Sequence, residues 1–89
     1  MLKVKAGFIL RKLGDEYMVV SVGDAAKDFN GIIRMNETGA FFWKELSAGT
    51  TEAALIDAAM AHYDGLDEKT ARRDVRRFLD TIHIALDAD

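Results

Sequence analysis

The hydrophobic pattern of the chain changes its period once, near Asn36. Apolar side chains first recur at every second position, at Val4, Ala6, Phe8 and Leu10, which is typical of a strand with one buried face. After Asn36 the apolar positions recur every three or four residues, which is typical of amphipathic helices. The beginning of the chain is therefore predicted to be β, and the remainder α.

The β part is predicted to contain three strands, near Lys5–Lys12, Tyr17–Val22 and Ile32–Met35. Gly14-Asp15 reads as the turn between the first two. Asn30-Gly31 fits a type I′ turn before the third, because both central residues of that turn need a positive φ. Successive hairpins pair neighbouring strands, so the expected sheet is an antiparallel meander in chain order.

Two alternatives stay open for the stretch 23–28. It forms either a surface loop, or a bend at Gly23-Asp24 after which the second strand continues to Phe29. We favour the bent strand, because Asn30-Gly31 specifies so tight a turn at its end.

The α part is predicted to contain three helices, near Glu37–Ser47, Glu52–Tyr63 and Glu68–Ala85. Asn36, Thr50 or Thr51, and Asp67 precede them as candidate N-caps, since these side chains accept hydrogen bonds from the first turn. The third helix has a predicted buried stripe of Ala71, Val75, Phe78, Leu79, Ile82 and Leu86.

Three consecutive aromatic residues, Phe41, Phe42 and Trp43, lie in the first helix. Successive helical residues are about 100° apart, so the three cannot all face inward. We expect two in the core and one partly exposed, where it could serve as a binding patch. Gly39 costs ~1 kcal/mol relative to Ala inside a helix, which indicates close packing at that point.

Neither the short strands nor the short helices can bury their apolar faces alone. The predicted fold is therefore α+β, with a three-stranded antiparallel meander followed by three α-helices in one domain, residues 1–89. A hairpin with three helices is also the inventory of a winged helix-turn-helix, although here the strands come first.

Composition and motif content argue against several classes of function. The 89 residues include no cysteine, so a disulfide or a thiolate metal site is excluded. His62 and His83 are isolated from other potential ligands, and we expect both on the surface. There is no nucleophile–base pair, phosphate loop or metal-ligand cluster, so we expect neither an enzyme nor a cofactor. No apolar run is long enough to span a membrane and no signal peptide is apparent, so a cytoplasmic location is expected.

The third helix carries four arginines, Arg72, Arg73, Arg76 and Arg77, in a chain of net charge −3. They form two stripes at four-residue spacing. They fit a solvated face with Glu68–Arg72 and Arg76–Asp80 pairs, or an anionic partner, which would be an acidic peptide or the phosphates of DNA.

The third strand, Ile32–Met35, is lightly protected for an edge strand. Its only charge is Arg34, and it contains no proline. An edge strand exposes unpaired N–H and C=O groups, which natural proteins usually shield. An unshielded edge can accept an added strand from a peptide, although a strand this short can also be harmless.

Two segments resemble the PqqD family: MNETGAFFW at residues 35–43 and DEKTARRDVRRFL at residues 67–79. The likeness covers nearly the whole chain. It implies a RiPP recognition element, which binds the leader of a ribosomal precursor peptide and presents it to a modifying enzyme, often a radical SAM protein. In that family the leader adds as an antiparallel strand beside the third strand, over a groove toward the third helix. Both a pyrroloquinoline quinone pathway and another peptide product stay open.

On that resemblance, the expected peptide-binding residues are Ile32, Ile33, Arg34, Met35, Arg72, Val75, Arg76 and Leu79. The expected partners are a precursor peptide and a modifying enzyme, with a homodimer as a further option and with no membrane partner. The rival functions are a DNA-binding winged helix, whose affinity would fall steeply with salt, and a dimeric interaction module.

Overall fold

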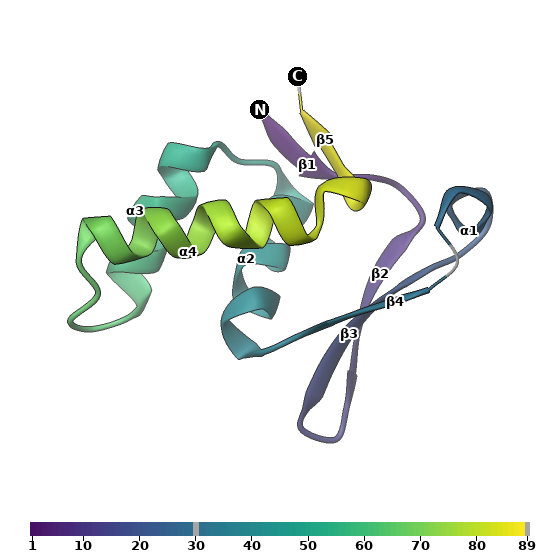
Figure 1. The fold of residues 1–89 in the computed structure, drawn as a ribbon, viewed down its shortest axis with the longest axis horizontal. Coiled ribbons are helices and arrows are strands. Elements are labelled where there is room, and N and C mark those ends of the chain that lie inside the picture. Colours follow the sequence, from purple (N-terminus) through teal and green to yellow (C-terminus); the bar gives the residue numbers. More distant parts are fainter. Residues whose placement is uncertain (30, 89) are drawn as a thin grey trace.

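The computed structural model describes residues 1–29 and 31–88. The elements in chain order are β1 (Leu2–Val4), β2 (Phe8–Leu13), β3 (Glu16–Ser21), α1 (Ala25–Asp28), β4 (Ile32–Met35), α2 (Glu37–Ala48), α3 (Glu52–His62), α4 (Glu68–Thr81), a 3₁₀ turn (His83–Ala85) and β5 (Leu86–Ala88). Figure 1 shows the helices α2, α3 and α4 gathered on one side, with the β2–β3 hairpin projecting from the other and β4 leading directly into α2.

The central sheet is an antiparallel meander in the order β2-β3-β4, followed by α2, α3 and α4, which confirms the predicted α+β fold. Leu10, Val19 and Ile33 face one another across the three strands. They belong to the apolar core or pack against it, so this face of the sheet lies against the helices. Because side chains alternate along a strand, the neighbouring residues point away from the core.

The three long helices begin where the sequence places them, each behind a side-chain cap. Asn36 Oδ1 accepts from the Gly39 N–H at 2.8 Å, Thr51 Oγ1 from the Ala54 N–H at 3.1 Å, and Asp67 Oδ1 from the Thr70 N–H at 2.7 Å. Each cap satisfies a backbone donor that has no partner within the helix. Local sequence is therefore sufficient to fix these helix starts.

The core lies between the inner face of the sheet and the three helices. Its largest fully buried side chains are Val19, Leu46, Leu55, Val75 and Ile82. Phe42 and Trp43 are buried as well, while Phe41 is only half-buried and stacks on His62 with ring centroids 4.3 Å apart. The expectation of two core aromatics and one partly exposed aromatic therefore holds.

The predicted first strand is interrupted, and its beginning pairs elsewhere. β1 and β2 are separate strands, because Lys5 donates its N–H to the Ala85 carbonyl at 2.7 Å and Gly7 adopts a φ of +90°. β1 pairs antiparallel with β5, from Leu2 opposite Ala88 to Val4 opposite Leu86. The period-two pattern runs through both strands, so it did not reveal the break.

The preferred bent strand across residues 24–29 is wrong, because residues Ala25–Asp28 form the short helix α1. Gly23, at a φ of +61°, ends the extended chain, and the N–H groups of Ala26 and Lys27 bond back to Gly23 and Asp24. Alanine and lysine favour helix, and here that local preference decides the conformation. The predicted Asn30-Gly31 turn includes a residue outside the described part of the chain.

The third long helix is shorter than the predicted Glu68–Ala85. α4 ends at Thr81, and the chain continues through a 3₁₀ turn into β5. Ile82 and Ala85 are nevertheless fully buried, and Leu86 packs against the core. The apolar spacing typical of a helix therefore continues into residues that are not part of α4. Pairing with the distant β1 overrides the local pattern.

Candidate functional site

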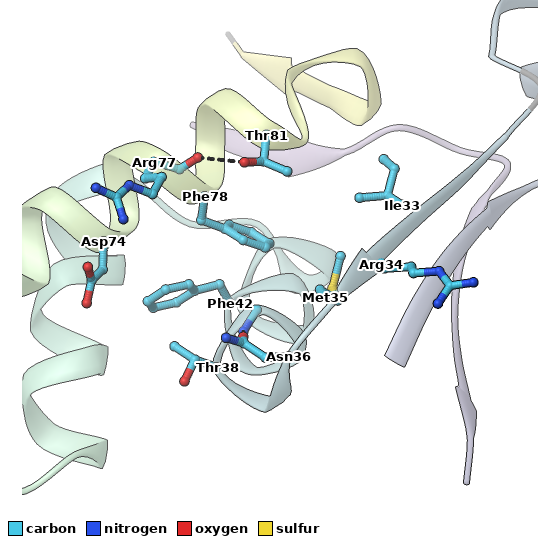
Figure 2. A pocket seen from close by; sticks show the side chains of 11 residues that line it. Ile33, Arg34, Met35, Asn36, Thr38, Phe42, Asp74, Arg77, Phe78 and Thr81 are labelled. Carbon is cyan, nitrogen blue, oxygen red and sulfur yellow. Dashed lines mark hydrogen bonds between the residues drawn. The ribbon is translucent and has the colours of Figure 1, made fainter. Parts of the chain in front are cut away.

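A groove of about 400 Å³ lies between β4, the start of α2 and one flank of α4. Figure 2 shows the side chains that line it. These residues are Ile33, Arg34, Met35, Asn36, Thr38, Gly39, Phe42, Asp74, Arg77, Phe78 and Thr81. The groove therefore combines a sheet edge, a helix N-terminus and a helix face.

The floor of the groove is apolar. The rings of Phe42 and Phe78 lie against each other with centroids 5.4 Å apart, and Ile33 and Met35 face them from β4 (Figure 2). Gly39 permits this close approach: a Cβ there would lie 2.9 Å from the Met35 Cβ and 3.3 Å from the Phe78 Cε1. Any other residue at position 39 would push the floor apart, which explains a glycine inside the helix.

The edge of β4 beside this floor has no strand neighbour within residues 1–29 and 31–88. β4 pairs with β3, from Tyr17 opposite Met35 to Val20 opposite Ile32, and no described strand pairs with its other edge. Ile33 and Met35 are half-buried, whereas Ile32 and Arg34 are exposed. An extended segment laid along β4 would therefore find backbone partners and would direct alternate side chains into the groove.

The rim of the groove is polar and carries both charge signs. Asp74 lies 3.8 Å from the Arg73 guanidinium, while Arg77 has no carboxylate within salt-bridge distance among the described residues. The Thr81 hydroxyl donates to the Arg77 carbonyl at 3.0 Å, a bond that Figure 2 also shows. Of the described residues that line the groove, Arg77 thus presents a guanidinium with no ion-pair partner.

Comparison with known proteins agrees with this arrangement. The family model described as coenzyme PQQ synthesis protein D (PqqD) matches residues 16–85. The chain belongs to the PqqD family. The matched region contains every residue that lines the groove. No curated protein matches the chain.

A solved structure shares the fold of this PqqD-family chain. It is described as "TbiB1 in Complex with the TbiA(beta) Leader Peptide", and it matches 98% of this chain and 99% of that chain with a TM-score of 0.76 and 23% sequence identity. Because this match covers 98% of the chain, it extends beyond the family match at both ends, where β1, β2 and β5 lie.

The structure brings the expected β4 residues to the groove but not the expected helix residues. Ile33, Arg34 and Met35 line it, with the Arg34 guanidinium directed away from the floor (Figure 2). Ile32 points to the opposite face of the sheet and is exposed. On α4, Val75 and Leu79 are buried in the core, and Arg72 and Arg76 form ion pairs outside the groove.

The flank of α4 that lines the groove is Asp74, Arg77, Phe78 and Thr81. Their spacing of three and four residues marks one helix face, directly beside the buried stripe. Sequence alone indicates two such flanks and does not say which one meets β4. Phe78, predicted to be buried within the stripe, is half-buried because it sits at this border.

Arg72 and Arg76, on the other flank of α4, contact carboxylates of the same chain rather than the groove. Arg76 bonds to the Glu52 carboxylate at 3.1 Å, linking α4 to α3, in place of the expected Asp80 partner. Arg72 pairs with Glu68 at 3.1 Å, as expected from their four-residue spacing. These cations are already partnered within the chain.

Asp67, the N-cap of α4, has a lowered pKa. Hydrogen bonds from the Thr70 backbone N–H and then its side chain lower the pKa of Asp67, with a smaller contribution from Arg73. Bonds to the ionised carboxylate favour the charged form. This places a stable negative charge at the helix N-terminus, where the helix dipole favours it.

Across residues 1–29 and 31–88, no three His, Cys, Asp or Glu side chains gather as metal ligands would. In the same part of the chain, no helix has the length and apolar character needed to cross a bilayer. Among the described residues, the groove offers main-chain hydrogen bonding, apolar contact and the guanidinium of Arg77.

Proposed function

We propose that this PqqD-family chain binds the leader of a ribosomally made precursor peptide along β4 and presents it to a modifying enzyme. The observation that carries the proposal is the open edge of β4 directly beside an apolar groove. The fold shared with TbiB1, whose structure is described as a complex with a leader peptide, supports it. Radical SAM enzymes are the first class to test as the modifying partner.

In this proposal the leader adds as a strand antiparallel to β4. Main-chain hydrogen bonds supply affinity without depending on the leader sequence, and the groove supplies specificity by accepting alternate side chains. β4 has four residues, so about two leader side chains face the groove in register with Ile33 and Met35. Phe42 and Phe78 favour apolar side chains there, since contact with their rings removes apolar surface from water.

The rim adds a preference for charge. Arg77 has no ion-pair partner among the described residues and lines the groove. A carboxylate on the leader can pair with it, and charge-assisted hydrogen bonds are among the stronger polar contacts. The leader is therefore expected to carry an acidic residue close to its apolar anchors.

A titration followed by amide chemical shifts tests the proposal. The ¹⁵N-labelled chain is titrated with the precursor peptide encoded in the same gene cluster, and with a control peptide of the same composition in scrambled order. The expected shifts cluster on residues 32–36 and on the groove flank of α4, and the scrambled peptide gives none there. Shifts confined to α3, or equal shifts with both peptides, would refute leader binding at β4.

DNA binding receives no support from the charge distribution. Arg72, Arg73 and Arg76 each lie within 4 Å of a carboxylate of the same chain. A net charge of −3 also opposes association with a polyanion. DNA binding would reveal itself by an affinity that falls steeply with salt, whereas strand addition depends on salt only weakly.

A further inference from the structure

The face of the sheet opposite the groove carries an ordered apolar surface. Ile9, Val20 and Ile32 lie directly opposite one another across β2, β3 and β4, so they form one row. The next row consists of Arg11, Met18 and Arg34. These two rows are called the outer rows below. Both face away from the helices, because the residues that alternate with them pack in the core.

Two of the apolar side chains in the outer rows are exposed, whereas Met18 and Val20 are half-buried. Ile32 is 56% exposed and Ile9 is 37% exposed, at the two ends of the first row. Leu13 and Val22, next to the outer rows at the ends of β2 and β3, are exposed as well. Four of the six large exposed hydrophobic residues among the described residues thus lie on or beside one sheet face. Scattered apolar residues need no explanation, but a contiguous patch indicates a binding surface.

The charge around the patch restricts what can cover it. Met18 lies between Arg11 and Arg34, in a chain with a net charge of −3. Arg34 has one exposed contact with Glu16 at 3.7 Å, and Arg11 has no ion pair among the described residues. Exposed pairs of this kind are weak and exchange readily for a better partner. A second copy placed face to face would bring four arginines together, which disfavours self-association.

We propose that the outer rows are the docking surface for the modifying enzyme, through an apolar patch on that enzyme rimmed by carboxylates. The proposal rests on the proposed function for the identity of this partner. The leader groove and the outer rows then occupy opposite faces of one sheet, so the two partners bind together without competing.

The geometry also couples the two surfaces. A leader strand added beside β4 directs alternate side chains into the groove, and its remaining side chains point outward beside Ile32 and Arg34. Those side chains extend the outer rows by one strand. The enzyme therefore meets a surface made jointly by this chain and the leader, and binds more tightly to the loaded form.

Affinity measurements with single variants test the surface. The probe is the modifying enzyme encoded beside this chain, titrated against the full chain with and without its precursor peptide. Ile9→Lys and Ile32→Lys should each weaken enzyme binding at least about tenfold, as expected when a charge replaces an apolar side chain that packs in an interface. Met60→Lys is the matched control, because Met60 is a similarly exposed apolar residue on α3. It should change enzyme affinity by less than about twofold.

Precursor affinity is measured on the same variants, which separates this proposal from the proposed function. Ile9→Lys should leave precursor binding unchanged, because Ile9 lies on β2 and outside the groove. If the wild-type chain binds the enzyme but not the precursor peptide, leader binding is refuted and the docking surface is not. Enzyme affinity unaffected by both isoleucine variants would overturn the docking surface.

A measurement on the wild type guards against variants that fail to fold. Methyl signals of Ile9, Met18, Val20 and Ile32 should shift on adding the enzyme, while the Met60 methyl should not. Shifts at Met60 alone would overturn the proposal. Sedimentation of the chain alone tests self-association. A dimer that Ile9→Lys dissociates would assign the outer rows to self-association and overturn enzyme docking.

Discussion

Arg76 and Arg77 are adjacent on α4 but differ in what surrounds them. Arg77 lines the groove, whereas Arg76 is held by Glu52 of α3. If an acidic leader residue pairs with Arg77, Arg77→Glu should weaken precursor binding by about five- to fiftyfold, the range of 1–2.3 kcal/mol expected for a charge reversal at a partly exposed contact. Isothermal titration calorimetry measures the change.

Arg76→Glu is the matched control for that experiment. It reverses the same charge one residue away and should leave precursor affinity nearly unchanged at moderate salt, because a charge that does not contact the ligand is largely screened. A loss confined to Arg76→Glu would place the peptide on the opposite flank of α4. Far-ultraviolet circular dichroism confirms that both variants keep their helices.

Phe42 and Phe78 share a ring contact, yet only Phe42 is buried in the core. Phe42→Ala should lower the free energy of unfolding by about 3–5 kcal/mol, the range for a deleted core aromatic. Phe78→Ala should cost only about 1–3 kcal/mol, because part of its ring is exposed in the groove before the deletion. Urea denaturation gives both values.

Phe78→Ala, the less destabilising variant, should nevertheless weaken precursor binding. Phe78→Ala opens the floor of the groove, so precursor affinity should fall while most molecules remain folded. Equal stability losses for the two variants would mean that Phe78 is a core residue, as its place in the apolar stripe suggests. The sequence identified the stripe but not its border, because burial at a border depends on which element packs against that flank.

The caps of α2, α3 and α4 are the elements most readable from sequence. Asn36, Thr51 and Asp67 each accept a hydrogen bond from three residues ahead, so the signal and the contact lie within one turn. The β2–β3 hairpin was readable for the same reason, since a short turn joins its two strands. Local signals also place one wall of the groove, because β4 passes into α2 through the Asn36 cap.

The Asp67 cap makes a pH-dependent contribution to stability. Its pKa is lower in the folded chain than in the unfolded chain, mainly because of the hydrogen bonds from Thr70. The contribution is therefore present above the unfolded pKa of about 4, and it is lost as the pH falls through the lower folded value. Asp67→Ala should lower the Tm at pH 7, and the difference from wild type should shrink below about pH 4.

Asp67→Asn supplies the control for the titration. Asparagine also caps helices but does not ionise, so its Tm should show less pH dependence between pH 7 and pH 3 than that of wild type. A Tm difference between wild type and Asp67→Ala that stays constant down to pH 2.5 would contradict an ionised cap. Thermal unfolding followed at the helix signal provides these values.

At the scale of the whole molecule, the pairing of β1 with β5 closes the fold. Leu86 packs against the core, and the Ala85 carbonyl accepts the Lys5 N–H at 2.7 Å. Removing residues 86–89 should lower the free energy of unfolding by about 1–2 kcal/mol, because Leu86 is half-buried and full burial of a leucine is worth about 1.5–3 kcal/mol. Precursor binding should persist, since no residue of β1 or β5 lines the groove. Urea denaturation and calorimetry measure the two effects.

Leu86→Ala separates the side chain from the strand. It keeps the backbone pairing with Val4, so a loss equal to that of the truncation would assign the whole effect to core packing. If the truncation abolished precursor binding at a temperature where the chain is still folded, the closing strands would also shape the groove.

This closure is what sequence analysis missed, together with the flank of α4 that faces β4. Both depend on contacts between residues far apart in the chain. Residues 82–86 keep the apolar spacing of a helix, but α4 ends at Thr81 and residues 86–88 are extended because they pair with β1. The groove likewise forms where β4 and α4 meet. The sequence therefore indicates two possible flanks of α4 but not which of them lines the groove.

The two ends of the described chain lie side by side, with Leu2 opposite Ala88 in the antiparallel pair (Figure 1). A domain with adjoining ends can be spliced into a surface loop of a larger protein without being pulled apart. The same proximity permits circular permutation: a short glycine linker could join the ends, with new ends opened at the Gly14-Asp15 hairpin turn. Fused in either way, the domain would keep its β4 edge facing outward, so it could be grafted onto an enzyme as a built-in recognition module.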